Sequence, residues 1–343
     1  MDFRRLPKIE LHAHLNGSLS NANILELYFL KYPKKDEEIN AKAYKVEKNL
    51  KKLTECFIKF KYAHELTDCP ERLARATENV IRDFSADNVV YLELRTTPRA
   101  TEYMTKEIYL KTVCETIRKC REIFPEIIVK LLPSIDRSYG VKNASETIDM
   151  IIEFRENFPD VIVGVDVSGN PIGTEFRKFR DCLQKARNAG LKIAVHCAET
   201  KGTVDENMEM LDFGMERMGH GTFMNESPET WNKLLEKKIF VECCISSNLK
   251  CGTVVDIDQH HIKKLLDADH PVGICTDDFG VFDTNLSREF EICSKTFNLS
   301  STDIESIILT SIEHSFATDS EKSTLKTLVS DFFTETEQAE NFT

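Results

Sequence analysis

Asn188-Ala189-Gly190-Leu191-Lys192-Ile193-Ala194-Val195-His196-Cys197-Ala198-Glu199 is the stretch that best indicates the fold of this chain. An amphipathic segment, Glu175–Ala189, ends at a glycine here, which is a common stop signal of a helix. The next run, Lys192–His196, is nearly all apolar, as expected for a parallel strand that is covered on both faces. His196 and Glu199 follow where the apolar run ends. The stretch therefore predicts a helix and then a strand that ends in chemically versatile side chains.

The same alternation of amphipathic segments and short apolar runs extends along the 343-residue chain. Helical spacing of apolar residues also predicts helices at Glu71–Asp87, Lys106–Ile123 and Ser145–Asn157. Eight runs are candidate strands: Lys8–His14, Val89–Arg95, Ile127–Leu132, Ile162–Val167, Lys192–His196, Arg217–His220, Phe240–Ile245 and Val272–Thr276. Alternating strands and helices imply parallel βαβ units, and eight units imply an α/β fold, the (β/α)8 TIM barrel.

Residues 1–343 are predicted to form one such domain, because no stretch resembles a linker and barrels commonly reach this size. Asn21–Leu66, between the first two strands, is too long for a single crossover. We expect extra capping helices there, over the mouth of the barrel. The polar residues Thr334–Thr343 are expected to be a frayed tail.

The composition excludes several classes of partner. The chain has 45 basic and 57 acidic residues, a formal charge of −12, which disfavours nucleic acid and anionic membranes. No apolar signal-peptide core and no run of about 18 apolar residues occurs. Eleven scattered cysteines without C-x-x-C spacing indicate a reducing compartment, so a cytoplasmic protein is expected. A monomer is the default expectation.

His12 and His14 form a His-x-His pair in the first candidate strand. Side chains at i and i+2 of a strand share a face, so the two imidazoles lie side by side. The pair alone does not define a metal site, because many histidines bind no metal. His196 and Asp277, at the ends of the fifth and eighth candidate strands, change this interpretation. Three imidazoles and a carboxylate at one barrel rim are ligand types that suit Zn²⁺.

Two further side chains at this rim are suited to catalysis. Glu199, three residues beyond His196, can perform general acid and base chemistry next to an activated water. His220, at the end of the sixth strand, could orient or deprotonate the same water, and Asp278 would face the substrate. Structural alternatives exist: His196 could be a core histidine, His220 a turn residue, and Asp277-Asp278 a helix cap. Coincidence at four strand ends is a poorer explanation than a shared site.

Four motifs resemble the adenosine and AMP deaminases of the amidohydrolase superfamily: Leu11–Ser18, His196–Glu199, Arg217–Gly221 and Thr276–Asp278. They occur in the same order and spacing over almost the whole chain. The resemblance implies one Zn²⁺ per chain held by His12, His14, His196 and Asp277. It implies that Glu199, His220 and Asp277 are catalytic, with Glu199 protonating purine N1 and His220 positioning hydroxide. It also implies purine contacts from Asp278 and the Gly169 backbone, and Asp136 is a further candidate for substrate binding. Cytidine deaminases use a P-C-x-x-C motif, which is absent here.

One departure from adenosine deaminases concerns the substrate. Asn16 replaces an Asp that serves the ribose 5′-hydroxyl in those enzymes, and an amide can donate a hydrogen bond to a phosphate. Thr96-Thr97-Pro98-Arg99 adds two hydroxyls and a guanidinium, and His64 could help. Arg99 could instead be a solvated loop residue, and His64 could make an interhelical hydrogen bond. The pattern resembles the subgroup that converts N6-methyl-AMP to IMP and methylamine, which implies a purine nucleoside monophosphate as the partner.

Three alternatives remain from the residues alone. The first is an adenosine deaminase that acts on the free nucleoside. The second is a related hydrolase of amides or esters; these often hold two metals bridged by a modified lysine, but Asp166 and Ser168 stand at the end of the fourth strand. The third is a non-catalytic nucleotide-binding barrel, which is disfavoured because no inferred ligand or acid is missing.

Overall fold

The computed structural model describes residues 1–33 and 53–341. Its eight strands form one parallel sheet in the order β1 to β8. The strands are β1 (Lys8–His14), β2 (Val89–Thr96), β3 (Ile128–Asp136), β4 (Gly164–Ser168), β5 (Lys192–Cys197), β6 (Arg217–His220), β7 (Phe240–Cys243) and β8 (Val272–Ile274). Ala13 pairs with Asp277 just beyond β8, so the sheet nearly closes on itself. The predicted TIM barrel is confirmed.

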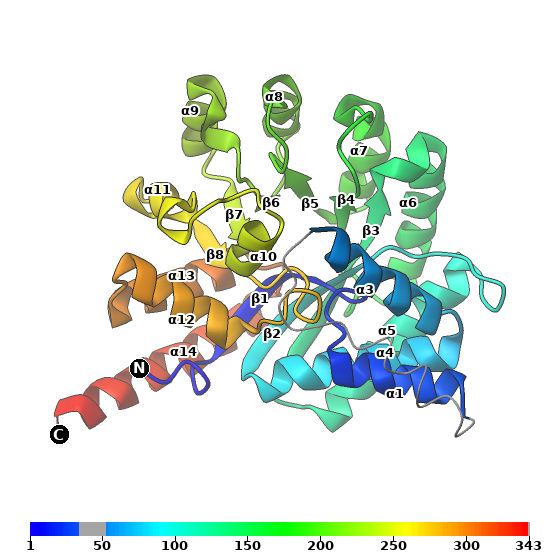
Figure 1. The fold of residues 1–343 in the computed structure, drawn as a ribbon, viewed down its shortest axis with the longest axis horizontal. Helices are drawn as coiled ribbons and strands as arrows, with labels where there is room; N and C mark the ends of the chain where they lie inside the picture. Colours follow the sequence, from blue (N-terminus) through cyan, green and yellow to red (C-terminus); the bar gives the residue numbers. More distant parts are fainter. Residues whose placement is uncertain (34–52, 342–343) are drawn as a thin grey trace.

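A ring of helices covers the outside of the barrel (Figure 1). Its members are α4 (Pro70–Ala86), α5 (Lys106–Ile123), α6 (Gly140–Asn157), α7 (Arg180–Asn188), α8 (Val204–Phe213), α9 (Pro228–Lys237), α11 (Ile262–Asp267), α12 (Leu286–Phe297) and α13 (Ser301–His314). Local signals define their ends. Ser300 and Asp303 form a capping box at the start of α13, with reciprocal bonds of 3.1 and 2.8 Å. Gly190 follows α7 with a φ of +80°, the left-handed conformation that ends a helix.

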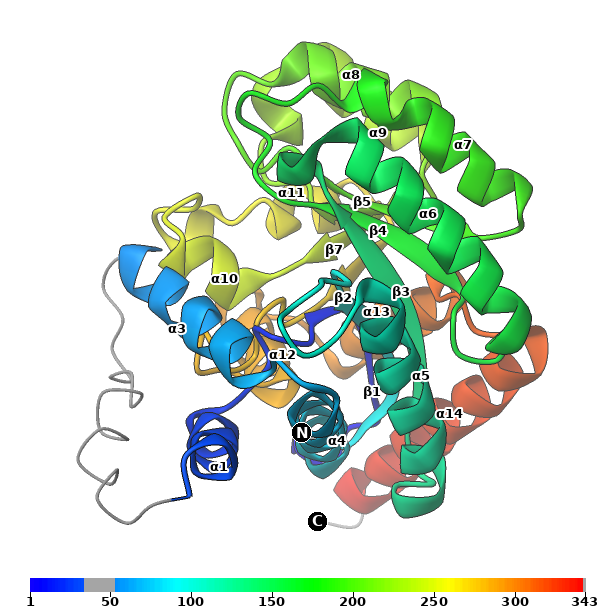
Figure 2. The ribbon, with the colours of Figure 1, turned by 90° about the vertical axis from the view of Figure 1, so that its right-hand side faces the viewer.

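The long connection between β1 and β2 contains α1 (Asn21–Lys31) and α3 (Leu53–Leu66), as well as α4. Figure 2 shows α3 on the same side of the barrel as α10 (Ile245–Lys250). The buried Lys59 of α3 donates to the carbonyl of Gly280, at 2.7 Å, in the loop after β8. This bond holds α3 over the rim, as expected for a capping helix. The remainder of the expected capping region, 34–52, lies outside the described residues.

Several predicted boundaries are wrong. β7 ends at Cys243, and Ile245 begins α10 instead of continuing the strand. Ile162 makes only an isolated bridge, and β4 starts at Gly164. The predicted helix Glu175–Ala189 is a 3-10 turn, Phe176–Phe179, followed by α7. The apolar spacing predicted the buried face correctly but could not distinguish two kinds of helical turn.

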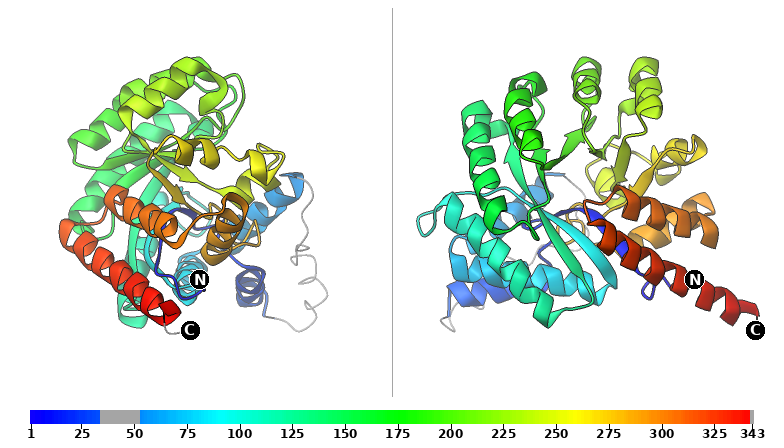
Figure 3. Two further views of the ribbon diagram at one scale, coloured as in Figure 1. Left: turned by 90° about the vertical axis from the view of Figure 1, so that its left-hand side faces the viewer. Right: turned by 180° about the vertical axis from the view of Figure 1, so that it is seen from behind.

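The C-terminal stretch that was expected to fray is largely helical, and its fraying stays a prediction. α14 (Asp319–Asn341) continues past Thr334, and Leu325, Val329 and Phe333 form its buried stripe. Lys130 of β3 pairs with Glu321 at 2.6 Å, which ties α14 to the barrel. Figure 3 shows α14 at the C-terminal end of the chain, beside the barrel. None of the helices in the described ranges combines the length and the apolar content that crossing a membrane requires.

The barrel interior below the rim is charged. Arg95 donates to Asp166 at 2.9 Å, and Arg217 donates to Glu242 at 2.7 Å. Arg95 also bonds Glu242, Arg217 also bonds Glu93, and all five side chains are fully buried. Branched apolar layers usually fill this space in TIM barrels. Here the network joins β2, β4, β6 and β7 across the axis.

Candidate active site

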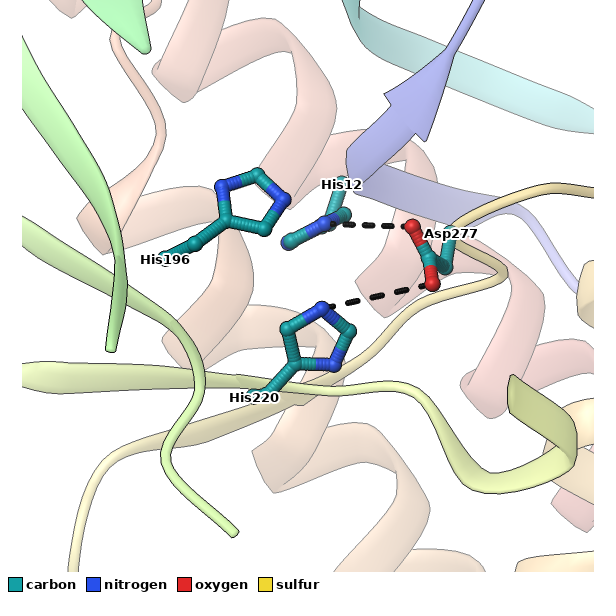
Figure 4. A group of neighbouring side chains, drawn as sticks. All are labelled: His12, His196, His220 and Asp277. Atoms are coloured by element: carbon teal, nitrogen blue, oxygen red, sulfur yellow. Dashed lines mark ion pairs between the residues drawn. The ribbon is translucent and has the colours of Figure 1, made fainter. Parts of the chain in front are cut away.

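Four of the predicted site residues meet at the carboxyl ends of the strands. His12 (β1), His196 (β5), His220 (β6) and Asp277 (after β8) each offer a ligand atom, and these atoms lie within 4.8 Å of one another (Figure 4). All four are buried. The parallel strands bring them to one rim although 265 positions separate the first from the last in the sequence. The cluster has the donor set and the spacing of a metal centre.

His14 extends this cluster. Its Nε2 lies 3.1 Å from Nε2 of His196 and 3.4 Å from Oδ1 of Asp277, and His12 Nε2 lies 3.4 Å from the same oxygen. Two ligand atoms about 2.1 Å from a common ion, at ordinary coordination angles, are about 3.0–3.4 Å apart. His12 Nε2 is buried and has no hydrogen-bond partner among the described residues. These observations fit a divalent metal between the side chains.

Two carboxylates orient the histidine rings. Nδ1 of His12 lies 2.7 Å from Oε2 of Glu242, and Nδ1 of His196 lies 3.1 Å from Asp166 and 3.0 Å from the carbonyl of Val167. A proton on each Nδ1 leaves each Nε2 lone pair free to bind a metal. Sequence reasoning missed Glu242; an acidic residue inside the apolar run Phe240–Ile245 was the available signal.

The backbone is strained at three of these strand ends. Ala198, His220 and Asp277 have φ values of 54°, 63° and 62° in the left-handed region. Few residues other than glycine adopt this conformation, and it accumulates at functional sites. Two backbone hydrogen bonds hold Asp277 in this conformation. Its N–H donates to the carbonyl of His12 at 2.8 Å, and its carbonyl accepts from the N–H of His14 at 2.9 Å.

Glu199 and Asp278 border the metal-type cluster. Oε1 of Glu199 lies 3.5 Å from Nε2 of His220, and its side chain is 31% exposed, so a ligand can reach it. Asp278 is buried, and its Oδ1 has no partner within the described part of the chain. Burial and the charge of Asp277 raise the pKa of Asp278 well above its usual value. A Cβ on Gly17 would lie 1.6 Å from Asp278 Oδ1, so any larger residue there would displace the Asp278 carboxylate.

Gly169 and Asp136 lie together at the ends of β4 and β3. Gly169 has a φ of +89°, and a Cβ on it would come within 1.9 Å of Asp136 Oδ1. The same oxygen accepts from the backbone N–H of Ser138 at 2.8 Å. The Asp136 carboxylate therefore stabilises the turn after β3 and packs against the Gly169 backbone.

A second polar cluster joins β1, the end of α3 and the end of β2. Nη2 of Arg99 donates to the carbonyls of His64 and Thr67, at 3.0 and 3.1 Å, and to the Thr67 hydroxyl at 2.7 Å. That hydroxyl donates to the carbonyl of Ala63 at 2.7 Å and lies 3.4 Å from Oδ1 of Asn16. Nη1 of Arg99 is buried without a hydrogen-bond partner among the described residues. Thr67, which connects Asn16 with Arg99, carries no sequence signal that distinguishes it from other threonines.

The Thr96-Thr97-Pro98 segment begins at the last residue of β2, and Thr96 in it differs from expectation. The Thr96 hydroxyl is buried and shares a 2.7 Å hydrogen bond with the Tyr109 hydroxyl of α5. It is therefore not a free phosphate ligand, and its contact with α5 stabilises the end of β2. Thr97 is half-buried and Pro98 is buried.

The fold and the site together define a class of protein. Histidines and a carboxylate at the carboxyl rim of a TIM barrel, with an acid beside them, are characteristic of barrel hydrolases that use a metal-activated water. The adenosine deaminase family model matches residues 7–332, and the chain belongs to that family. It is a hydrolytic deaminase that acts on C–N bonds.

Individual relatives cover nearly the whole chain. An adenosine deaminase-like protein of Drosophila melanogaster is 44% identical over 92% of this chain and 93% of its own length. The human N6-methyl-AMP deaminase is 38% identical over 94% of this chain and 92% of its own. A crystal structure of Arabidopsis ADAL complexed with IMP superposes with a TM-score of 0.88 at 37% identity, covering 97% of this chain and 98% of that one.

Proposed function

We propose that this protein hydrolyses N6-methyl-AMP, and related N6-substituted purine nucleoside monophosphates, to IMP and an alkylamine. The main support for a monophosphate substrate is the Asn16–Thr67–Arg99 cluster, which lies on the same rim as the histidines. Amide and guanidinium groups are donors that suit a 5′-phosphate. Relatives named N6-methyl-AMP deaminase and neighbouring structures that hold IMP or GMP support the same substrate class.

One Zn²⁺ is the proposed cofactor, with His12, His14, His196 and Asp277 as ligands. His220 is left out of this set, because its Nε2 lies 4.0 Å from the nearest Asp277 oxygen, whereas Nε2 of His14 lies 3.4 Å from Asp277. When bound, the metal lowers the pKa of water and supplies hydroxide at neutral pH. The Asp277 carboxylate is kept in place by Ser247, whose hydroxyl donates to its Oδ2 at 2.7 Å.

The side chains around the cluster perform the remaining steps of the proposed reaction. Glu199 protonates purine N1, so that the ring can accept electrons when water adds to C6. His220 positions the attacking oxygen, and Asp278 with the Gly169 backbone holds the N7 side of the purine. The C6–N6 bond then breaks, and methylamine leaves with a proton while C6 keeps the oxygen.

The first prediction concerns substrate preference. Purified protein with zinc should release IMP from N6-methyl-AMP with a kcat/KM at least about 100-fold above that for adenosine, because two or more charge-assisted bonds to phosphate contribute about 3 kcal/mol. Steady-state assays with N6-methyl-AMP, AMP and adenosine measure this directly. Equal or faster turnover of adenosine would identify a plain adenosine deaminase. A protein that binds nucleotides and turns over none of the three would be a non-catalytic barrel.

The second prediction tests the proposed phosphate contact. Arg99→Ala should raise KM for N6-methyl-AMP about 10- to 100-fold and change kcat/KM for adenosine less than about 3-fold, since only the monophosphate loses a charged partner. Arg72→Ala is the matched control, because Arg72 also binds a backbone carbonyl at the end of α3, that of Leu66 at 3.1 Å. If Arg99→Ala impairs both substrates alike, Arg99 only fastens α3.

The monomeric state and the cytoplasmic location stay predictions. Light scattering coupled to gel filtration tests the first, with the mass of one 39.3 kDa chain as the expected result. Fractionation of cells that express the protein tests the second. Nearly all cysteines of the described residues are buried.

A further inference from the structure

His220 has two possible roles, and the position of its ring proton decides between them. A histidine with a proton on the nitrogen that faces the water can donate a hydrogen bond and orient the water. A histidine with a bare nitrogen there can instead remove a proton. The partner of the other ring nitrogen determines which neutral tautomer is present. For His220 this other nitrogen is Nδ1, which lies 3.4 Å from Nδ2 of Asn248.

His260 fixes the orientation of the Asn248 amide. Nδ1 of His260 accepts from the backbone N–H of Ile262 at 3.2 Å, so it carries no proton. A neutral imidazole keeps one proton, which must then be on Nε2. Burial, together with His261 and His220, lowers the pKa of His260 to about 2, so the ring is neutral. Nε2–H of His260 therefore donates to Oδ1 of Asn248, at 3.0 Å.

The amide of Asn248 consequently has one allowed orientation. If it were turned over, its N–H2 group would face the N–H of His260, which places two donors together. With the oxygen on His260, the N–H2 group faces His220 and donates to its Nδ1. Asn248 is 3% exposed and His260 is 1% exposed, so bulk water offers neither group another partner.

The surroundings of His220 agree with this direction. Its Nε2 faces Oδ2 of Asp277 at 4.0 Å (Figure 4). Oε1 of Glu199 lies 3.5 Å from the same nitrogen, and either oxygen can accept a hydrogen bond. The backbone carbonyl of His220 accepts a hydrogen bond from Nε2 of His261 at 2.7 Å. This bond stabilises the left-handed backbone conformation of His220. Both ring nitrogens thus have partners consistent with a bare Nδ1 and a protonated Nε2.

We infer that Asn248 and His260 are positioning residues that hold His220 in the Nε2–H tautomer, so that His220 donates to the attacking water and does not deprotonate it. This inference rests on the proposed function for the identity of the reaction. The water's proton passes to a carboxylate of the site and then to the departing amine, and the C6–O bond forms as the C6–N6 bond breaks. Neither positioning residue touches the substrate.

Asn248→Asp is the decisive variant, because it keeps the shape of the side chain and replaces the donor to His220 by an acceptor. We expect Nδ1 of His220 to become protonated and kcat to fall about 10- to 100-fold, with KM within about 3-fold and zinc content unchanged. Nitrogen-15 NMR of histidine-labelled protein, recorded with and without zinc and assigned with a His220→Gln variant, identifies the protonated nitrogen.

Variants of His260 test the inference independently of Asn248. His260→Gln retains an N–H donor for Asn248 and should keep most of kcat, whereas His260→Phe removes the donor and should lower it like Asn248→Asp. His270→Phe is the control for loss of a buried histidine, because among the described residues His270 bonds only the carbonyl of Ile239, at 2.7 Å, before β8 begins.

Two outcomes would overturn the inference. The first is an unsubstituted protein whose His220 carries its proton on Nδ1. The second is an Asn248→Asp variant with an unaltered His220 signal and unaltered kcat. The NMR measurement requires no substrate, so it decides the tautomer even if N6-methyl-AMP proves not to be turned over. Failure of the proposed function is thereby distinguished from failure of this inference.

Discussion

Glu199→Gln is expected to lower kcat for N6-methyl-AMP at least about 1000-fold while the zinc content stays at one per chain. The glutamine keeps the size of the side chain but has no carboxyl proton to give to purine N1. Without that proton the ring cannot accept the electron pair from the attacking water. Glu199 stands beside the histidines, near His220, and outside the cluster of close ligand atoms, so metal binding should survive. Steady-state kinetics and metal analysis of the same sample measure both quantities.

Glu175→Gln is the matched control for this experiment. Glu175 lies on the same side of the barrel in an exposed loop and pairs with Lys178 at 2.5 Å. Its substitution should change kcat less than about 2-fold, since exposed ion pairs contribute little. A Glu199→Gln enzyme that stays active would exclude the acid role. Loss of zinc together with activity would instead make Glu199 part of the metal centre.

Glu242→Gln is expected to reduce the free energy of unfolding of the metal-free protein by about 3 kcal/mol. Glu242 is fully buried between Arg95 and Arg217 and also contacts Nδ1 of His12. Burial alone would raise its pKa, but the two guanidiniums outweigh burial and hold the pKa well below its usual range. The neutral amide removes the negative charge that pairs with both buried arginines, and the site is too deeply buried for bulk water to compensate. Urea denaturation in the presence of a chelator measures the change.

The same substitution should weaken zinc binding about 10- to 100-fold, because a neutral amide supports the Nδ1–H of His12 less well than a carboxylate. Glu146→Gln is the control, since Glu146 is 63% exposed and pairs with Lys142 at 3.9 Å. It should cost less than about 0.5 kcal/mol and leave zinc affinity unaltered. If both variants unfold at the same urea concentration, the buried network does not stabilise the barrel.

Local patterns predicted most of the fold. The predicted strands Lys8–His14 and Arg217–His220 have the observed bounds, and the helix Lys106–Ile123 does too. Apolar periodicity is a property of neighbouring residues, so it can be read without knowing the tertiary structure. The errors fall where local preference competes with packing. Ile245, an apolar residue after an apolar strand, starts a helix because the chain must turn at the rim.

Site prediction succeeded where a residue type itself indicates chemistry. His12, His196, His220 and Asp277 could be named from motifs, and the structure brings them together. Thr96 was expected to bind phosphate, but its hydroxyl bonds Tyr109 in the interior. A hydroxyl has the same sequence signal whether it faces a ligand or a neighbouring helix. Only packing decides its direction.

The sequence by itself determined the barrel, the residues at its rim and the class of chemistry, because strand periodicity and metal-ligand motifs are encoded within short segments. Tertiary structure alone decided which distant residues hydrogen-bond to the residues at the rim and orient them. Glu242 reaches His12 across 230 positions, and His260 acts on His220 through Asn248. These contacts depend on how the nearly closed sheet and its loops juxtapose distant segments. A hydrogen bond is directional and short-ranged, so no local pattern specifies its partner.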